Sequence, residues 1–256
     1  MHEKFILRLA VFAFITILPG GAQEPLLEAS RPGIEQIVRQ YILQHPEVLM
    51  ESVRLYQERE RTAQKERSKE AVSARLGDLQ HDPSSPAAGP ADGVTVVEFF
   101  DYRCAYCKRA ETTVLKLLAE HPDVRVIFKE FPFLGPESSL AAKASLAAAR
   151  QGAYLKFHQA LMAFSGPITM NAIEELAGKQ GLDVSKLKVA MESPEVQLIL
   201  ARNRELGIKL GVNGTPAFVV GTEVISGAID SATFERLLAQ AKAGTAPRAG
   251  IYSRGQ

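Results

Sequence analysis

Two cysteines, Cys104 and Cys107, are the only cysteines in the 256 residues of this chain. They follow an apolar run, Val94 to Phe100, and precede a segment with the apolar spacing of a helix. A strand that leads directly into Cys-x-x-Cys places the first sulfur at a helix N-terminus, where free backbone N–H groups and the helix dipole favour a thiolate. The second sulfur lies one turn later, within reach of a disulfide. The pattern therefore predicts a redox-active cysteine pair at a strand-to-helix junction.

Three other interpretations of the cysteine pair are open. A structural disulfide across so short a loop would remove little entropy from the unfolded chain and would stabilise the fold weakly. Half of a zinc site would need further ligands, and the five histidines show no ligand spacing. The third alternative is a pair of incidental buried thiols. We favour the redox interpretation, in which the disulfide itself is the reactive group and neither a cofactor nor a metal is expected.

The first residues of the chain have the pattern of a secretory signal peptide. A weakly basic start precedes an apolar stretch from Phe5 to Leu18, and Gly20 and Ala22 supply small residues before a cleavage position. This stretch is short for a membrane span, and an uncleaved N-terminal anchor is the alternative. We therefore expect residues 1–22 to direct the protein out of the cytoplasm and into a compartment in which disulfides persist.

Composition divides the remaining chain. Its 30 basic and 29 acidic residues nearly cancel, which gives no argument for nucleic acid or for an acidic substrate. Residues 23–78 have a helical and highly charged pattern, whereas residues 79–92 contain three prolines with Ser, Gly and Ala and predict a linker. We expect a catalytic domain over residues 93–245 and a loose tail over residues 246–256.

Residues 23–78 carry an apolar stripe that they cannot bury by themselves. His45-Pro46 divides them into two helices, and Leu49, Val53 and Tyr56 follow a heptad-like spacing on the second. About 50 residues form a marginal core at best. The stripe predicts self-association; the alternatives are that the helices fold back on the catalytic domain or form a solvated single helix.

The catalytic domain alternates strands and helices and is predicted to have an α/β fold. Strands are expected at 94–100, 124–131, 217–220 and up to Ser226. Helices are expected at 104–121, at several positions between Pro136 and Gly211, and at 231–242.

This order of elements resembles the Dsb-type thioredoxin-fold disulfide oxidoreductases of bacterial envelopes. Three motifs carry the resemblance, namely Glu98-Phe-Phe-Asp-Tyr-x-Cys-x-x-Cys-Lys, Phe128-Lys-Glu-Phe-Pro and Gly214-Thr-Pro-Ala-Phe. Residues 30–78 also resemble the N-terminal oligomerisation region of a subgroup typified by the suppressor-of-copper-sensitivity thiol proteins, several of which are trimeric isomerases. The resemblance implies a thioredoxin fold with a helical insertion, preceded by an N-terminal α-helical oligomerisation segment, in the periplasm.

The resemblance also implies roles for individual residues. Cys104 would be the exposed nucleophile and Cys107 the buried resolving thiol, because exchange passes through a mixed disulfide. Pro216 matches the cis-proline of the family, and the backbone of Thr215 would pair with an extended substrate beside Cys104. An ordinary strand-edge proline is the alternative for Pro216.

Three charged residues match those that lie beneath the disulfide in this family: Glu98, Glu111 and Lys129. Glu98 is the one acid in an apolar strand, and Lys129 on the neighbouring strand is the expected partner. A carboxylate near Cys107 could also take up its proton during exchange. The alternative is that all three residues form ion pairs with no catalytic part.

The sequence departs from the family pattern between the cysteines. The family usually has proline after the first cysteine, and strong oxidases have histidine next, whereas this chain has Ala105-Tyr106. Alanine lacks the fixed φ of proline at the helix start, and tyrosine adds no positive charge. Weaker thiolate stabilisation predicts an intermediate reduction potential within the superfamily.

We therefore predict a periplasmic thiol–disulfide oxidoreductase that acts as an isomerase or reductase. Its expected partners are cysteine-containing envelope proteins, a membrane redox partner and further copies of itself, with a trimer favoured. The alternatives are a monomeric oxidase and a Cu(I)-binding metal-tolerance protein that uses the same two thiols.

Overall fold

The structure is a computed structural model and describes residues 24–245. Two sequence predictions, the signal peptide at 1–22 and the tail at 246–256, lie outside the described residues. The chain divides into two compact units, residues 1–59 and 60–256. None of the helices between residues 24 and 245 is both long and apolar enough to cross a bilayer.

The first unit is helical. It contains α1 (Glu24–Gln44) and the first part of α2 (Pro46–Ser73), and His45 separates the two helices. Pro46 is the first residue of α2, a position where the missing N–H of proline costs nothing. Many large apolar side chains on residues 31–59 of this unit are exposed, among them Ile37, Tyr41, Val53 and Tyr56. The apolar stripe predicted from the sequence is therefore present and uncovered in the single chain.

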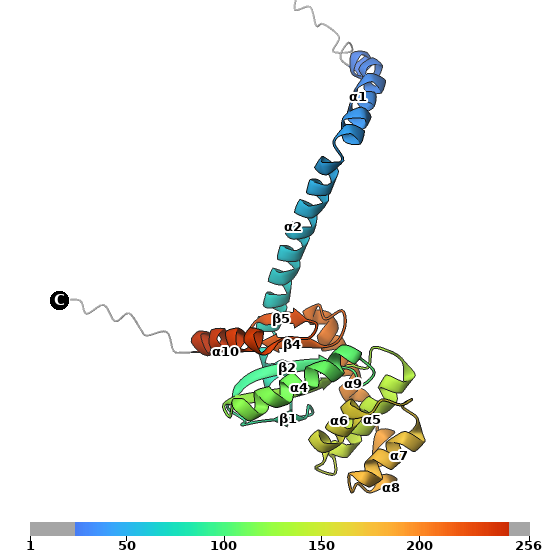
Figure 1. The fold of residues 1–256 in the computed structure, drawn as a ribbon, viewed down its shortest axis with the longest axis vertical. Coiled ribbons are helices and arrows are strands. Elements are labelled where there is room, and N and C mark those ends of the chain that lie inside the picture. Colours follow the sequence, from blue (N-terminus) through green and yellow to red (C-terminus); the bar gives the residue numbers. More distant parts are fainter. Residues whose placement is uncertain (1–23, 246–256) are drawn as a thin grey trace, which may run out of the picture. The chain divides into compact units, whose positions relative to one another are not determined.

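A five-stranded sheet forms the centre of the second unit (Figure 1). Its order is β1 (Ala87–Ala88), β3 (Val124–Glu130), β2 (Val94–Phe100), β4 (Ala217–Val220) and β5 (Glu223–Ser226). The central pair, β2 and β3, is parallel, and the other neighbours are antiparallel. Most residues of both central strands are buried, as is typical of strands covered on two faces. β2 is mainly apolar, whereas β3 also carries Arg125, Lys129 and Glu130.

Helices cover both faces of the sheet. One face packs against α4 (Ala105–Glu120), α10 (Ser231–Thr245) and the helical insertion, and it holds the larger core. The insertion consists of α5 (Pro136–Ala149), α6 (Tyr154–Ala163), α7 (Met170–Lys179), α8 (Val184–Met191) and α9 (Pro194–Leu210). The other face holds a smaller core with Val72, Leu79, Phe131 and Leu210. This arrangement confirms the predicted thioredoxin fold with a helical insertion.

The predicted linker at 79–92 is wrong. This segment follows α3 (Leu76–Gln80) and then forms β1, which pairs with β3 at the sheet edge. Its prolines lie outside β1, so they remove no ladder hydrogen bond, which is why a proline-rich segment can border a sheet. The Asp82 carboxylate also pairs with Lys129 Nζ at 2.6 Å. The segment is therefore an integral part of the second unit.

The unit boundary lies earlier, within α2. The last part of this helix belongs to the second unit, where Val72 is fully buried in the smaller core. Lys65 and Lys69 both pair with Glu223 on β5. Residues from about 60 onward are consequently needed to complete the catalytic unit.

Candidate active site

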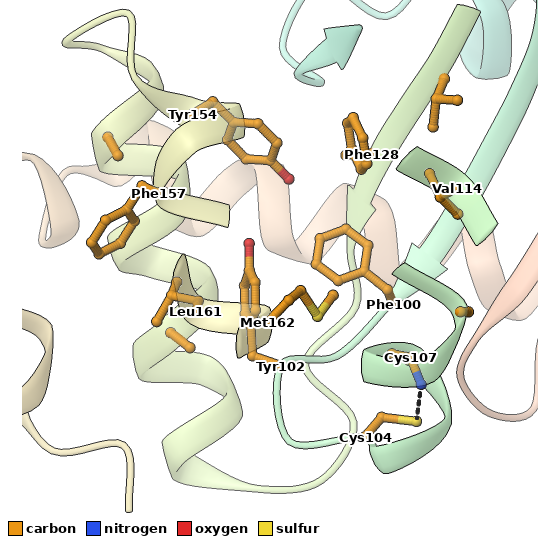
Figure 2. Close-up of a cluster of buried hydrophobic side chains, with 14 of the residues drawn as sticks. Phe100, Tyr102, Cys104, Cys107, Val114, Phe128, Tyr154, Phe157, Leu161 and Met162 are labelled. Atoms are coloured by element: carbon orange, nitrogen blue, oxygen red, sulfur yellow. Dashed lines mark hydrogen bonds between the residues drawn. The ribbon is translucent and has the colours of Figure 1, made fainter. Parts of the chain in front are cut away.

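The two cysteines lie at the start of α4, where the apolar strand β2 gives way to a helix (Figure 2). Cys104 is the N-cap residue, and its Sγ accepts the backbone N–H of Cys107 at 3.3 Å. Both are free thiols in this structure. Cys104 keeps 6% of its surface exposed, whereas Cys107 has none. Both cysteines are therefore buried, and Cys104, at the helix N-terminus, is the less deeply buried of the two.

Burial separates the two thiols chemically. It raises the pKa of the Cys107 thiol well above its ordinary value, and the hydrogen bond with Cys104 acts in the same direction. A thiol that stays protonated does not attack, so the first step of exchange falls to Cys104.

The loop before β4 lies against Cys104. The Thr215–Pro216 peptide bond is cis, in agreement with the expectation from the family resemblance. The thiol of Cys104 donates a hydrogen bond to the Thr215 carbonyl oxygen at 3.2 Å. Pro216 in turn accepts the N–H of Gly227 at 2.8 Å, which ties this loop to the residue after β5. The backbone of Thr215 is therefore next to the reactive sulfur.

The residues between the cysteines differ from the expected picture in one respect. Tyr106 is 60% exposed, and the guanidinium of Arg109 lies 4.3 Å from the centroid of its ring. This cation–π contact holds a positive charge near the first turn of α4. The Tyr106 side chain carries no charge, but its ring holds the charged guanidinium of Arg109 in place.

Asp101 organises the entrance to the site, a role that sequence reasoning missed. Its carboxylate accepts the N–H groups of Phe133 at 2.7 Å and Leu134 at 2.9 Å, and it also accepts the Ser138 hydroxyl and the N–H of Arg103. These bonds fasten the loop after β3 to the loop that carries Cys104. The only sign of this role in the sequence was an acidic residue at the end of a predicted buried strand. Most of the residues that donate hydrogen bonds to Asp101 are remote in sequence.

Glu98 is fully buried, and neither of its carboxyl oxygens has a hydrogen-bond partner among the described residues. Burial raises its pKa well above the ordinary value, and the nearby charges of Glu111, Cys104 and Glu130 reinforce the effect. Burial therefore favours the protonated form of the Glu98 carboxyl. A buried carboxyl that senses Cys104 is suited to exchange a proton as the thiols change state.

The predicted pairing of Glu98 with Lys129 is wrong. In the register of β2 and β3, Glu98 lies opposite Phe128, and Lys129 lies opposite Phe99. Side chains alternate between the faces of a sheet, so Glu98 and Lys129 point to opposite faces. Glu98 shares its face with the cysteines, and Lys129 pairs with Asp82 on the other face.

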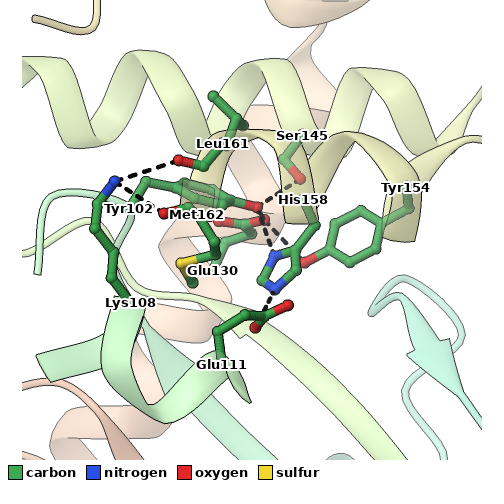
Figure 3. Close-up of polar contacts among 9 residues, drawn as sticks. All are labelled: Tyr102, Lys108, Glu111, Glu130, Ser145, Tyr154, His158, Leu161 and Met162. Carbon is green, nitrogen blue, oxygen red and sulfur yellow. Dashed lines mark hydrogen bonds and ion pairs between the residues drawn. The ribbon is translucent and has the colours of Figure 1, made fainter. Parts of the chain in front are cut away.

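Glu111 instead joins a buried polar cluster that the sequence did not reveal (Figure 3). Its Oε2 lies 3.2 Å from Nε2 of His158, and Nδ1 of His158 lies 2.9 Å from the Tyr102 hydroxyl. The Tyr102 and Tyr154 hydroxyls each donate to Glu130 Oε1 at 2.9 Å. His158 itself is fully buried.

Glu130 ends this cluster on β3. Burial raises its pKa to about 8, although the two tyrosine hydroxyls and Ser145 act to lower it. Its backbone oxygen accepts the side-chain amide of Asn203 on α9 at 3.2 Å. The cluster members come from the loop between β2 and α4 and from β3, α4, α5 and α6, so only the folded chain brings them together.

The described residues 24–245 contain no group of three or more His, Cys, Asp or Glu side chains arranged to hold a metal ion. The arrangement at the start of α4 is that of a dithiol with one accessible sulfur, one protected sulfur and a backbone carbonyl beside them. Such a site can exchange a disulfide with another molecule.

Comparison with known proteins agrees with this site. Residues 95–239 match the family model of the DSBA-like thioredoxin domain, which spans more than half of the chain, so the chain belongs to that family. The domain is that of a thiol–disulfide oxidoreductase. Residues 33–63 match a second model, the copper resistance protein ScsC N-terminal domain, which places the chain in the ScsC-like subgroup.

Several known proteins are similar over large parts of the chain. A thioredoxin-like oxidoreductase from Silicibacter pomeroyi is 42% identical, with a TM-score of 0.64, over 65% of this chain and 97% of that one. An ScsC linker-deletion mutant from Proteus mirabilis is 29% identical, with a TM-score of 0.65, over 90% of this chain and 99% of that one. The probable disulfide bond formation protein D of Bacillus anthracis is 29% identical over 54% of this chain and 70% of that protein.

Other curated relatives are much longer proteins. The Na(+)/H(+) antiporter NhaA 3 of Salinispora tropica is 31% identical over 52% of this chain, and the match covers 21% of that protein. The chain thus spans about a fifth of the length of this relative.

Proposed function

We propose that the protein exchanges disulfides with other proteins of the bacterial envelope through Cys104 and Cys107. The observation that carries the proposal is the position of Cys104 Sγ, between the first turn of α4 and the Thr215 carbonyl oxygen. A client chain that lies along Thr215 would present its own sulfur to the more accessible thiol. The family resemblance supports a periplasmic location.

The proposed reaction has two exchange steps. The Cys104 thiolate attacks one sulfur of a client disulfide, and the other client sulfur leaves as a thiolate and takes up a proton. The Cys107 thiol then loses its proton and attacks Cys104, which releases the second client sulfur as a thiolate. The client is reduced by two electrons and the protein is oxidised to the Cys104–Cys107 disulfide. The reverse sequence oxidises a client. Attack of a different client thiolate on the client sulfur of the mixed disulfide releases the Cys104 thiolate and isomerises the client.

Glu98 is proposed to exchange the proton of Cys107 during the second step. Its carboxyl is fully buried on the sheet face that holds the cysteines, and the charge at Cys104 acts with burial to raise its pKa. Glu111 would act on Glu98 through charge, since its pKa effect on Glu98 is the largest after burial. Lys129 lies on the other face and is proposed to have a structural role only.

Substitution of each cysteine tests the order of the steps. Cys104→Ser should abolish insulin reduction, because the only accessible nucleophile is lost. Cys107→Ser should keep the first step and accumulate mixed disulfides that non-reducing gels resolve. Faster alkylation of Cys107 than of Cys104 at neutral pH would reverse the assignment.

The proposed direction is isomerisation or reduction by a homo-oligomer, with a trimer favoured. The exposed stripe of α1 and α2 and the ScsC-type N-terminal match support self-association. Several sites around one partly folded client raise the effective concentration of reactive thiols. This direction requires a membrane redox partner that keeps the site reduced.

Thiol trapping in cells measures the direction of flux. A reduced Cys104–Cys107 pair at steady state is expected for an isomerase or reductase. A fully oxidised pair would instead favour the oxidase alternative.

A further inference from the structure

A surface groove next to the active site is not used by the reaction described above. It has a volume of about 600 Å³ and lies between the loop after β3 and helix α9. Its apolar lining includes Phe131, Phe133, Leu200, Ile208 and Val212. We call it the α9 groove.

The floor of the α9 groove is held in place by close packing. The rings of Phe131 and Phe133 are stacked, with centroids 6.4 Å apart and an interplanar angle of 11°. Phe131 also lies against α9 at Gly207, where a Cβ atom would come within 2.6 Å of its ring. Only glycine leaves room for this ring, so the aromatic floor is fixed by the fold.

The groove nevertheless exposes apolar surface to water. Phe133 is 56% exposed and Ile208 is 62% exposed. Exposed large apolar side chains that gather in one concave patch mark binding surfaces, whereas scattered ones do not.

The charged groups that line the groove are of one sign. Lys143 and Arg204 line it, and no carboxylate does. Lys143 is paired with Glu192 at 3.5 Å, whereas Arg204 has no ion-pair partner among residues 24–245. The groove therefore combines an apolar floor with an available cation, which complements a ligand that is both apolar and acidic.

Two residues that line the groove are linked to the active site by the chain or by a hydrogen bond. Asn213 lines it and precedes Thr215, whose carbonyl oxygen accepts the Cys104 thiol, by two residues. On the other side, the N–H of Phe133 binds the Asp101 carboxylate, three residues before Cys104. A chain that pairs with Thr215 would enter the groove within a few residues, since an extended chain advances about 3.3 Å per residue.

We propose that the α9 groove binds an extended client segment adjacent to the reactive client cysteine, and that it selects segments with an apolar side chain and an acidic residue. This inference rests on the proposed function and adds the class of substrate. The aromatic floor receives the apolar side chain, and Arg204 pairs with the carboxylate.

The test uses two disulfide-bonded peptide substrates that differ only in one flanking residue, glutamate or lysine, beside a leucine. The measured quantity is kcat/KM for each peptide relative to kcat/KM for glutathione disulfide, which is too small to span the groove. Ile208→Asp should lower this ratio for the glutamate peptide by about tenfold or more, from lost apolar contact and added repulsion. Leu198→Asp is the matched control, because Leu198 is 48% exposed on the same helix and lies outside the groove.

A charge reversal gives a second readout that a purely structural effect would not produce. Arg204→Glu should exchange the preference, so that the lysine peptide becomes the better substrate. Thermal unfolding by circular dichroism verifies that each variant is folded.

Three results would overturn the inference. The ratio for Ile208→Asp could equal that for Leu198→Asp, or Arg204→Glu could leave the peptide preference unchanged. Alternatively, Ile208→Asp could change the oligomeric state in light scattering, which would make a second copy the occupant. Failure of the unsubstituted protein to react with glutathione would instead contradict the proposed function itself.

Discussion

Three carboxyl groups are buried on the side of the sheet that holds the cysteines, and each has a different set of polar contacts. Glu98 has no hydrogen-bond partner among the described residues, Glu111 contacts His158, and Glu130 accepts two tyrosine hydroxyls. Burial of an unsatisfied polar group costs about 1–3 kcal/mol. The retention of Glu98 at such a cost is consistent with a role in the reaction rather than in stability.

Replacement of Glu98 by leucine should separate stability from activity. Glu98→Leu removes the unsatisfied oxygens, so the reduced protein should gain about 1–3 kcal/mol in the free energy of unfolding. The second exchange step should slow, because the Cys107 thiol loses the carboxyl that, in its ionised form, is proposed to accept its proton. Urea unfolding and the rate of mixed-disulfide resolution measure the two effects. Glu98→Gln keeps a buried polar group and should show no gain in stability; slower resolution without stabilisation in Glu98→Leu would contradict the energetic argument.

Glu130 should make stability depend on pH. Its pKa is about 8 in the fold, against an ordinary value of 4.5. Between these values the native state keeps a proton that the unfolded state has released, so stability falls as pH rises through this window. The fall is at most about 1.4 kcal/mol per pH unit, and above about pH 8 it is complete.

Urea unfolding of Glu130→Gln at several pH values checks this dependence. The variant cannot ionise at this position, so its stability should decline less than that of the unsubstituted protein between about pH 4.5 and 8. Glu120→Gln is the control, since the Glu120 side chain is 56% exposed and pairs only with Lys116 among the described residues. Parallel pH profiles for Glu130→Gln and the unsubstituted protein would refute the assignment.

At the scale of elements, local patterns predicted the helices and strands well. The expected strand at 124–131 and helix at 104–121 agree closely with β3 and α4, because apolar spacing is a local signal. The proline-rich segment was misjudged because its pairing partner, β3, lies about 40 residues away.

Side-chain direction was the harder problem within the site. Glu98 and Lys129 were expected to pair, yet a difference of one residue in strand register decides which face each occupies. The cluster around His158 was also missed, because its members are separated by up to 56 positions and gather from several helices. The cysteines and Pro216 were found because their motifs carry the chemistry in the sequence itself.

The ion pair between Lys129 and Asp82 should hold the segment around β1 against the sheet. The Lys129 side chain is 1% exposed, so loss of its partner would leave a buried charge. Burial acts to raise the pKa of Asp82, but the hydrogen bonds from Lys129 and Ser84 outweigh this effect and hold that pKa below its ordinary value. The pair therefore adds stability above the ordinary pKa of an aspartate, and this contribution is lost as pH falls.

A double-mutant cycle measures the pair. Asp82→Asn should lower the free energy of unfolding by about 3–5 kcal/mol, because it strands the buried ammonium group. Asp82→Asn combined with Lys129→Met should recover most of that loss, since no buried charge remains. Exchange with glutathione serves as the functional readout. Equal destabilisation by the single and the double variant would rule out a specific pair.

At the scale of the whole molecule, the unit boundary determines where the chain can be divided. A protein that begins at residue 60 keeps Val72, Leu79, Asp82 and β1, all of which belong to the second unit. It should be a folded monomer that still exchanges disulfides with glutathione. It should lose the refolding of scrambled ribonuclease, which depends on several sites around one client.

A protein that begins at residue 91 is the matched comparison. It lacks the edge strand and part of the smaller core, so it should unfold at a lower temperature than the protein that begins at residue 60. Light scattering of the full-length and shortened proteins measures the assembly. A monomeric full-length protein would leave a simple oxidase or reductase with a helical extension.

The exposed position of Tyr106 leaves the protein open to adjustment by evolution or by engineering. The side chain is 60% exposed and lies against the guanidinium of Arg109, so the two residues between the cysteines should be exchangeable without disturbing the core. We therefore expect Ala105-Tyr106 to set the driving force of the reaction, whereas client choice, under our proposal, is set on α9. Two properties that a redox catalyst must balance are thus encoded at separate places, and a library that varies one can leave the other intact.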